Sequence, residues 1–294
     1  MKLTTTCVPC LLRRVAYEVE LCAPGRSMKA LRECSKIVGL RASDEISSAE
    51  FASEVHQCAY EVIGEDDPYF ELKKKSNEVA LGLFQEAERI VESSKNPMRT
   101  AMILSIIGNR LDFGIAGSLI SPDLLKREFR NLLKEPLGWD DSAKIAKMLG
   151  KSDEVIFLAD NCGEIVFDKI FLKKIKEIGP RIVLVIKGEP ILTDVTRRDL
   201  KGIGIEKTVD EVIETEGIAV GLNLWDKHVN VKLRKRMKNS DLIISKGMAN
   251  FEAMSELNWK ASAYLMRAKC APVSNALKVR FDTNVIKLVG GKTS

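Results

Sequence analysis

The stretch Val155-Ile-Phe-Leu-Ala-Asp-Asn-Cys-Gly-Glu164 decides the fold, because a continuous apolar run passes abruptly into a polar segment that contains glycine. The apolar part, Val155–Ala159, is typical of a strand buried on both faces of a parallel sheet. Behind it, Asp168–Ile178 has apolar residues at helical spacing and ends near Gly179 and Pro180. The stretch therefore predicts a strand, a turn and a helix, which form the first unit of an α/β domain.

The same rhythm continues towards the end of the chain. Further strands are predicted at Arg181–Ile186, Glu211–Ile213, Asp241–Ser245 and Val285–Val289, with a helix from about Asn250. Strands that alternate with helices predict right-handed βαβ units and a parallel sheet covered on both faces. The expected fold class is therefore α/β, with a Rossmann-like parallel sheet that has helices on both faces.

The first half of the chain has a helical rhythm instead. Apolar spacing predicts helices at Cys10–Val19, Phe51–Ile63, Lys75–Ser93, Arg99–Ile107 and from Pro122 to about Lys134. No convincing strand precedes residue 150, and glycine and aspartate interrupt the pattern between Gly138 and Ser152. We therefore expect an all-α helical domain over residues 1–145 and a Rossmann-like α/β domain over residues 146–294.

Composition narrows the class of protein. The 294 residues are 45% hydrophobic, which is ample for a large core, and the 30% of charged residues leave a formal net charge of only +5. Basic residues are scattered apart from a cluster at Lys232–Lys238, whereas a dedicated nucleic-acid-binding protein would concentrate them. No apolar run approaches the roughly 18 residues that span a bilayer. Neither nucleic acid nor a membrane is therefore expected as a partner.

The start of the chain and the cysteines bear on the cellular compartment. The apolar stretch within Met1–Leu12 is too short and broken for a signal peptide, and Arg13 and Arg14 follow it directly. The seven cysteines are better interpreted as thiols or ligands than as a disulfide framework. We expect a cytoplasmic protein, whose oligomeric state the sequence leaves open.

Chemistry concentrates after the predicted strands, where ligands bind in open α/β sheets. The polar segments are Asp160-Asn161-Cys162-Gly163-Glu164, Lys187-Gly188-Glu189-Pro190 with Asp194 soon afterwards, and Ser245-Lys246-Gly247-Met248-Ala249-Asn250. Carboxylate and amide oxygens suit magnesium or manganese, lysines suit phosphate oxygens, and glycines let backbone amides approach an anion. Singly, each segment has a plainer interpretation, such as Asp160 as a helix N-cap. Together they predict a functional site.

Six segments, taken in order, resemble the damage-control phosphatases, and the prokaryotic branch with an N-terminal Cys-x-x-Cys in particular. The resemblance runs nearly the whole length and rests on Cys7-Val8-Pro9-Cys10, Gly108-Asn109-Arg110-Leu111-Asp112-Phe113-Gly114, Leu158-Ala159-Asp160-Asn161-Cys162-Gly163-Glu164, Lys187-Gly188-Glu189-Pro190-Ile191-Leu192-Thr193-Asp194-Val195-Thr196, Ser245-Lys246-Gly247-Met248-Ala249-Asn250-Phe251-Glu252 and Arg267-Ala268-Lys269-Cys270. It implies a helical domain packed on a Rossmann-like catalytic domain. It also implies hydrolysis of small phosphorylated metabolites with manganese, nickel, cobalt or magnesium.

The resemblance also assigns residues. Asp160, Asn161 and Asp194 match the metal ligands of the family, and Lys246 matches its phosphate-binding lysine. Asp160, Lys246, Glu164 and Asp112 are the candidate catalytic residues, and Glu164 and Asp112 are alternatives for orienting the attacking water. The expected substrate-binding residues are Asn109, Gly163, Lys187, Gly247, Asn250 and Lys269. Lys269 falls in a stretch one residue shorter than the Arg-Thr-x-Lys motif of eukaryotic relatives.

Two other functions stay open at this point. Cys7 and Cys10 are compatible with a thiol- or metal-sensing protein whose α/β domain binds a ligand, although a tetrahedral site needs four ligands and no second cysteine pair has this spacing. Carboxyl methyl transfer is the second alternative. It requires a nucleotide-like cofactor pocket, and no glycine-rich loop after the first strand supports one.

Overall fold

The computed structural model describes residues 1–108 and 128–291. Its centre is a seven-stranded sheet in the order β1-β7-β6-β5-β2-β3-β4. The strands are β1 (Leu137–Asp140), β2 (Glu154–Leu158), β3 (Arg181–Ile186), β4 (Glu211–Glu214), β5 (Leu242–Lys246), β6 (Ala261–Ala268) and β7 (Thr283–Gly290). All neighbouring strands are parallel except β6 and β7, which are antiparallel. The expected α/β fold with a Rossmann-like sheet is confirmed.

Three expectations about strands were incomplete. The sheet is mostly rather than wholly parallel, and two strands, β1 and β6, were not predicted. β1 could not be recognised in the sequence because Leu137-Gly-Trp-Asp140 is a short edge strand with three exposed residues and no apolar run. β6 was not predicted because Ser262 and Arg267 interrupt its apolar pattern, although every residue of the strand is buried. The statement that no strand precedes residue 150 was therefore wrong.

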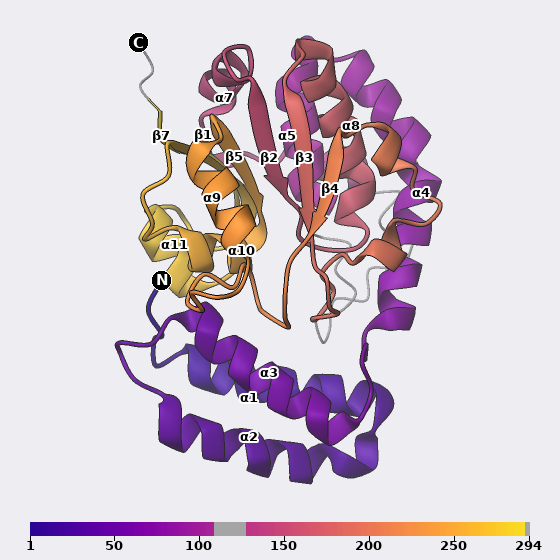
Figure 1. Ribbon diagram of the computed structural model, residues 1–294. Coiled ribbons are helices and arrows are strands. Elements are labelled where there is room, and N and C mark those ends of the chain that lie inside the picture. Colours follow the sequence, from indigo (N-terminus) through magenta and orange to yellow (C-terminus); the bar gives the residue numbers. More distant parts are fainter. Residues whose placement is uncertain (109–127, 292–294) are drawn as a thin grey trace.

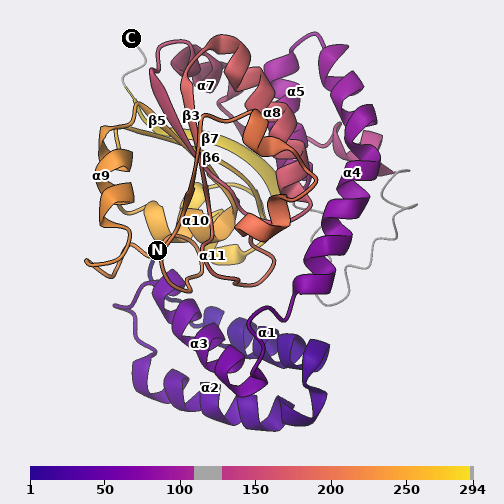
Figure 2. The same cartoon turned by 45° about the vertical axis from the view of Figure 1, so that its right-hand side comes forward.

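The helices fall into three groups. One face of the sheet is covered by α4 (Phe70–Glu92), α5 (Pro97–Ile107), α7 (Ser142–Leu149) and α8 (Glu164–Ile178). The opposite face is covered by α9 (Val231–Asn239), α10 (Gly247–Met254) and α11 (Ala271–Leu277). A separate layer beyond one end of the strands contains α1 (Cys7–Cys22), α2 (Ser27–Arg41) and α3 (Ser48–Ile63). Figure 2 shows α4 reaching from this layer along the side of the sheet.

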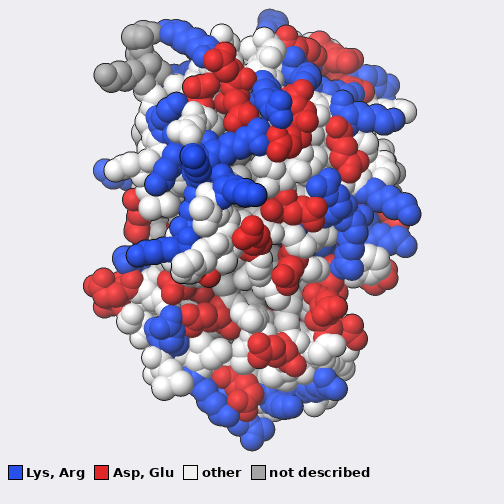
Figure 3. Space-filling model, viewed as in Figure 1, with Lys and Arg blue, Asp and Glu red and all other residues white. Residues whose placement is uncertain are grey.

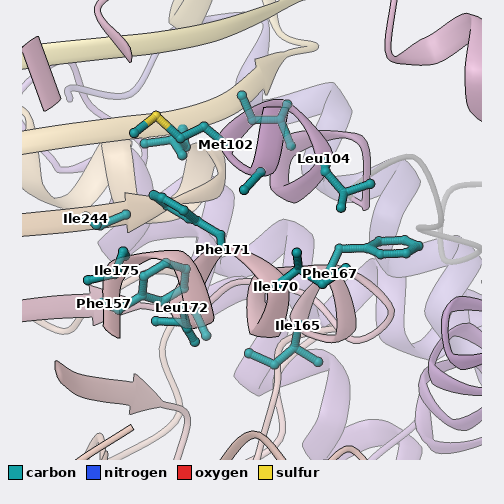
Figure 4. Packing of buried hydrophobic residues seen from close by; sticks show 14 of the residues in the cluster. Met102, Leu104, Phe157, Ile165, Phe167, Ile170, Phe171, Leu172, Ile175 and Ile244 are labelled. Carbon is teal, nitrogen blue, oxygen red and sulfur yellow. The ribbon is translucent and has the colours of Figure 1, made fainter. Parts of the chain in front are cut away.

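Two hydrophobic cores hold the sheet layers together. Alternate residues of each strand face opposite sides, so Phe157 and Ile244 pack with Met102 of α5 and Phe171 of α8, as Figure 4 shows. The intervening strand residues, such as Ile156, pack against α9, α10 and α11. Both faces are therefore apolar, which explains the continuous apolar runs seen in the sequence.

The two-domain division at residues 145 and 146 stays a prediction. α4, α5 and β1 all precede that point, yet α4 and α5 pack against α8, and β1 pairs with β7 of the sheet. The chain before residue 64 forms its own core, which includes Val15, Phe51 and Val55. The predicted helix from Pro122 to about Lys134 falls largely outside the described residues.

The surface carries both charge signs. Figure 3 shows basic side chains gathered over the region of α9, with acidic and basic residues intermixed on the rest of the face. The basic cluster predicted at Lys232–Lys238 lies on this helix. Within residues 1–108 and 128–291, no helix combines the length and apolar character needed to cross a membrane.

Candidate functional site

The site lies at the carboxyl end of β2, where the strands that follow in sequence are added first on one side of β2 and then on the other. β2 lies between β3 and β5, and the helices that follow β2 and β5, namely α8 and α10, cover opposite faces. This is a topological switch point, where open α/β sheets bind ligands beyond the carboxyl ends of the strands. Asp160 follows β2 here and Gly247 follows β5. Gly247 has a positive φ of 77°, and a Cβ built on it would overlap the Asp160 carboxylate.

Backbone pairing brings Asp160, Asn161 and Asp194 together. Asn161 and Asp194 form an isolated antiparallel bridge, and the Val195 N–H donates to the Asp160 carbonyl at 2.9 Å. The Asn161 amide donates to Asp160 Oδ2 at 2.6 Å and accepts a hydrogen bond from Thr193 Oγ1 at 2.7 Å. The exposed fractions of Asp160, Asn161 and Asp194 are only 6%, 8% and 6%. Two segments more than thirty residues apart thus join into one polar cluster.

Asp160 does not cap α8, the helix that follows it. α8 begins at Glu164 and its N-cap is Gly163, three residues after Asp160, with no side-chain capping bond. The plainer interpretation of Asp160 therefore does not apply, and another reason is needed for a buried carboxylate at this position.

Lys187 supplies positive charge beside these carboxylates. Its ammonium lies 3.5 Å from Asp194 Oδ2 and donates to the carbonyls of Ala219, at 2.8 Å, and of Gly221. Burial lowers the pKa of Lys187, while the attraction of Asp194 and Asp160 opposes that shift. The carboxylates of Asp160 and Asp194 and the ammonium of Lys187 therefore give this buried site a formal net charge of minus one.

This donor set fits a hard divalent cation. Carboxylate oxygens from Asp160 and Asp194 and the amide oxygen of Asn161 are the ligand types that magnesium and manganese take in proteins. Gly247 leaves room against Asp160 that any larger residue would fill. Among the described residues, no group of three or more histidine, cysteine, aspartate or glutamate side chains is arranged to hold a metal. The proposed site differs in its donors, because one of its three side chains is the amide of Asn161.

Lys246 is placed differently from its expected role. It is the last residue of β5, opposite Leu265 of β6, so its side chain follows the pleat onto the face covered by α5 and α8. Its ammonium is fully buried and donates to Glu164 at 2.5 Å, Asp168 at 2.6 Å and the Ser105 carbonyl at 3.1 Å. A lysine has three N–H donors, and all three are used inside the protein. The role of Lys246 as a phosphate ligand stays a prediction.

The buried group around Lys246 has its own electrostatics. Burial raises the pKa of Asp168 to about 7, with Lys246 opposing the rise and Glu164 adding to it. Burial by itself would lower the pKa of Lys246, but the attraction of Asp168 and Glu164 raises it overall. Ser105 Oγ also donates to Asp168 at 2.5 Å. Lys246 is therefore a charged residue fixed between two carboxylates.

The remaining expected substrate-binding residues lie around the strand ends. The Gly163 N–H donates to Asn77 of α4 at 2.6 Å, so in this arrangement that amide is already paired. The Asn250 amide donates to the carbonyls of Ala159, at 3.1 Å, and Lys246, at 3.0 Å, which ties α10 to the end of β2. Lys269 follows β6, one strand further from Asp160 than β5 is. Asn109 and Asp112 lie outside the described residues.

Several residues that contact the site could not be identified from the sequence pattern. Thr193 and Asn77 contact Asn161 and Gly163 from loops and helices far away in the chain. The sequence pattern predicts Asp168 to be an ordinary residue of an amphipathic helix, yet its side chain is fully buried against Lys246. Such contacts depend on packing between elements, which periodicity does not report.

The cysteine pair lies apart from these groups. Cys7 and Cys10 are in the first turn of α1, where Cys7 is half-buried and Cys10 exposed. Cys7 Sγ lies 3.2 Å from Thr4 Oγ1. Burial and, to a smaller extent, Cys7 and Cys10 raise the pKa of the nearby Cys270 thiol, yet the described residues include no group of three or more histidine, cysteine, aspartate or glutamate side chains that could hold a metal.

Comparison with known proteins gives a consistent result. Residues 3–285 match the model of the damage-control phosphatase ARMT1-like domain. A damage-control phosphatase of Archaeoglobus fulgidus is 36% identical over 98% of this chain and 100% of its own length. A damage-control phosphatase of Pyrococcus horikoshii is 33% identical over 95% of both chains. The crystal structure of a DUF89 family protein from Pyrococcus horikoshii superimposes with a TM-score of 0.86 and 32% identity, and covers 97% of this chain and 98% of the other.

These matches extend over nearly the whole chain and include every described residue of the polar cluster. They confirm the family resemblance carried by the strand-end segments. The chain belongs to the family of damage-control phosphatases with an ARMT1-like domain.

Proposed function

We propose that the protein is a metal-dependent phosphatase that hydrolyses phosphomonoesters of small metabolites, such as sugar phosphates or damaged, cofactor-related phosphates. The observation that carries this proposal is the convergence of Asp160, Asn161 and Asp194 at the switch point of the sheet. Membership of the damage-control phosphatase family supports it, and so do the names of the relatives from Archaeoglobus fulgidus and Pyrococcus horikoshii.

The residues that would hold the ion are Asp160, Asn161 and Asp194, with manganese, nickel, cobalt or magnesium as the expected metal. When bound there, such an ion supplies positive charge that offsets the negative charge developing on the phosphoryl oxygens. The formal charges favour this arrangement. Asp160, Asp194 and Lys187 sum to minus one, and a divalent ion makes the total plus one, which attracts a phosphate group.

Lys187 forms an ion pair with Asp194, one of these carboxylates. We assign it the task of keeping Asp194 in place and of adding positive charge where the phosphate binds. Its ammonium is anchored by the carbonyls of Ala219 and Gly221, so little reorganisation is needed when substrate arrives. Gly247 and Asn250 keep the end of β5 close to Asp160, so the backbone at the start of α10 lies beside the proposed ion.

Glu164 is our candidate for orienting the attacking water, with Asp112 as the alternative. Glu164 is the first residue of α8, and Lys246 holds its carboxylate at 2.5 Å. Lys246 then contributes by fixing Glu164 rather than by binding phosphate itself. In-line attack at phosphorus by a positioned water requires this kind of fixed geometry.

The proposal also places the enzyme in the cytoplasm. All seven cysteines belong to the described residues and all are free thiols. Free thiols of this number are typical of proteins kept in a reducing compartment.

Release of inorganic phosphate tests the proposed function. The purified protein is incubated with a panel of phosphorylated metabolites and a chromogenic phosphate ester, with added Mn²⁺, Ni²⁺, Co²⁺ or Mg²⁺ and after exhaustive chelation. We expect phosphate release that chelation abolishes and added metal restores. Full activity after chelation, or no release from any substrate with any metal, would overturn the proposal. A carboxyl methyltransferase or a thiol sensor would release no phosphate.

A further inference from the structure

Helix α3 faces the carboxyl ends of the strands, as Figure 1 shows, and two of its side chains hydrogen-bond to loops beside the polar cluster. Its Ser53 and Tyr60 are seven residues apart and therefore project from the same face of the helix. Ser53 accepts a hydrogen bond from the Val220 N–H, and Tyr60 accepts one from the Leu192 N–H. These two bonds join the helical layer to two different loops of the α/β layer.

The Tyr60 bond fixes the loop that carries Asp194. The phenol oxygen of Tyr60 is 2.9 Å from the Leu192 nitrogen, and the Tyr60 side chain is only 6% exposed. Leu192 has a positive φ of 48°, a left-handed conformation that glycine adopts readily and that strains a leucine. The next residue, Thr193, donates to Asn161, and Asp194 follows. The turn at Leu192 thus sets the position of both groups.

The Ser53 bond fixes the loop that anchors Lys187. Ser53 Oγ donates to the Ala49 carbonyl at 2.7 Å and accepts from the Val220 N–H at 2.8 Å, so its hydroxyl is both donor and acceptor. The residues on either side of Val220 provide the two carbonyls that receive the Lys187 ammonium. Ser53 therefore lies two contacts away from the ammonium that faces Asp194.

We propose that α3 positions the metal-binding groups, with Tyr60 as the positioning residue for Asp194 and Ser53 as that for Lys187. The inference rests on the proposed function, because it assigns a role towards a metal ion held by Asp160, Asn161 and Asp194. It makes the helical layer part of the site rather than a cover over it. Tyr60 acts on the site through the Leu192 N–H.

The test compares Tyr60→Phe with Tyr69→Phe. Tyr60→Phe keeps the ring but removes the acceptor of the Leu192 N–H. Tyr69 is a matched control, since it is fully buried and its hydroxyl lies 3.5 Å from Glu18, within the helical layer. Binding of Mn²⁺ alone is measured by titration calorimetry, and amide hydrogen exchange is measured for peptides covering residues 187–196 in the metal-free protein.

We expect Tyr60→Phe to weaken Mn²⁺ binding about ten-fold, which corresponds to about 1.4 kcal/mol. It should also speed amide exchange in residues 187–196, while Tyr69→Phe changes neither quantity. Adding Leu192→Gly to Tyr60→Phe should restore part of the affinity, because glycine adopts the left-handed turn without strain.

Two results would overturn the inference. One is wild-type Mn²⁺ affinity and exchange in Tyr60→Phe. The other is an equal loss of affinity in both tyrosine variants that follows their loss of melting temperature, which would indicate a general packing effect. Failure of the wild-type protein to bind Mn²⁺ would instead refute the proposed metal site, and the exchange measurement would still test the link between α3 and the loop.

Discussion

Replacement of Lys246 by methionine separates two roles for this lysine. A phosphate ligand would be lost with little effect on folding, as the sequence alone suggested. In the structure, however, the ammonium lies between Glu164 and Asp168 and is fully buried. Lys246→Met keeps the length and apolar stem of the side chain but leaves two carboxylates facing each other without a cation.

The expected cost follows from that geometry. Removal of one partner from a buried ion pair destabilises proteins by about 3–5 kcal/mol, because the remaining charge has no compensation. Ser105 Oγ still donates to Asp168 at 2.5 Å in the variant, which offsets part of the loss. We therefore expect the free energy of unfolding to fall by about 3–4 kcal/mol at pH 7.

The cost should grow with pH. Burial raises the pKa of Asp168 and Lys246 opposes that rise, so without the lysine the folded variant keeps the Asp168 proton to higher pH than the unfolded chain does. Stability then falls as pH rises. In the wild-type protein the attraction of the Lys246 ammonium opposes the rise in the pKa of Asp168 and so reduces this dependence. The difference between variant and wild type is therefore smaller at pH 5.5 than at pH 8.5.

Urea denaturation of metal-free wild type and Lys246→Met at pH 5.5, 7.0 and 8.5 measures these quantities. A loss below about 1 kcal/mol at pH 7, in the range of an exposed ion pair, would refute the buried-pair reasoning. A loss that is independent of pH would do the same. Either result, together with a raised KM for phosphorylated substrates, would return Lys246 to the role of a phosphate ligand.

Three further predictions concern the same region. Mn²⁺ at a free concentration a hundred times Kd should raise the melting temperature of the wild-type protein by about 5 °C. Asp160→Asn should abolish this rise and nearly abolish turnover. A preserved rise would contradict the metal-ligand assignment. Asp168 has a folded-state pKa of about 7, raised by burial above the unfolded value of about 3.9, so metal-free stability should fall as pH rises from 4 to 7. Asp168→Asn should flatten that fall, and an unchanged pH profile from urea denaturation would count against it. Cys7→Ser combined with Cys10→Ser should leave Mn²⁺ affinity unchanged in calorimetry, whereas loss of binding would implicate the cysteine pair.

Much of the fold was predictable from hydrophobic runs. β2, β3 and β5 are buried on both faces, so their apolar residues are continuous and stand out from the surrounding sequence. β6 is equally buried but contains Ser262 and Arg267, and Arg267 is tolerated because it pairs with Asp282 and Glu135. Pairing of this kind depends on residues far apart in the chain, and a local pattern does not reveal it.

The candidate site was predictable in part. Asp160, Asn161 and Asp194 could be grouped in advance, because strand ends of a parallel sheet share one edge. The direction of the Lys246 side chain could not be predicted. The expected strand ended at Ser245 and left Lys246 at the edge of the sheet, whereas β5 includes Lys246, whose side chain therefore lies on one face of the sheet. The link from Tyr60 to Leu192 spans 132 residues and depends on how α3 packs, which no periodicity encodes.

The position of the metal ion tests the proposed site most directly. Crystals grown with Mn²⁺ and measured near the manganese absorption edge locate the ion by its anomalous signal. We predict one strong peak within bonding distance of oxygen atoms from Asp160, Asn161 and Asp194. A peak elsewhere, for example at Cys7 and Cys10, or no peak between these three side chains at saturating Mn²⁺, would contradict the proposed metal site.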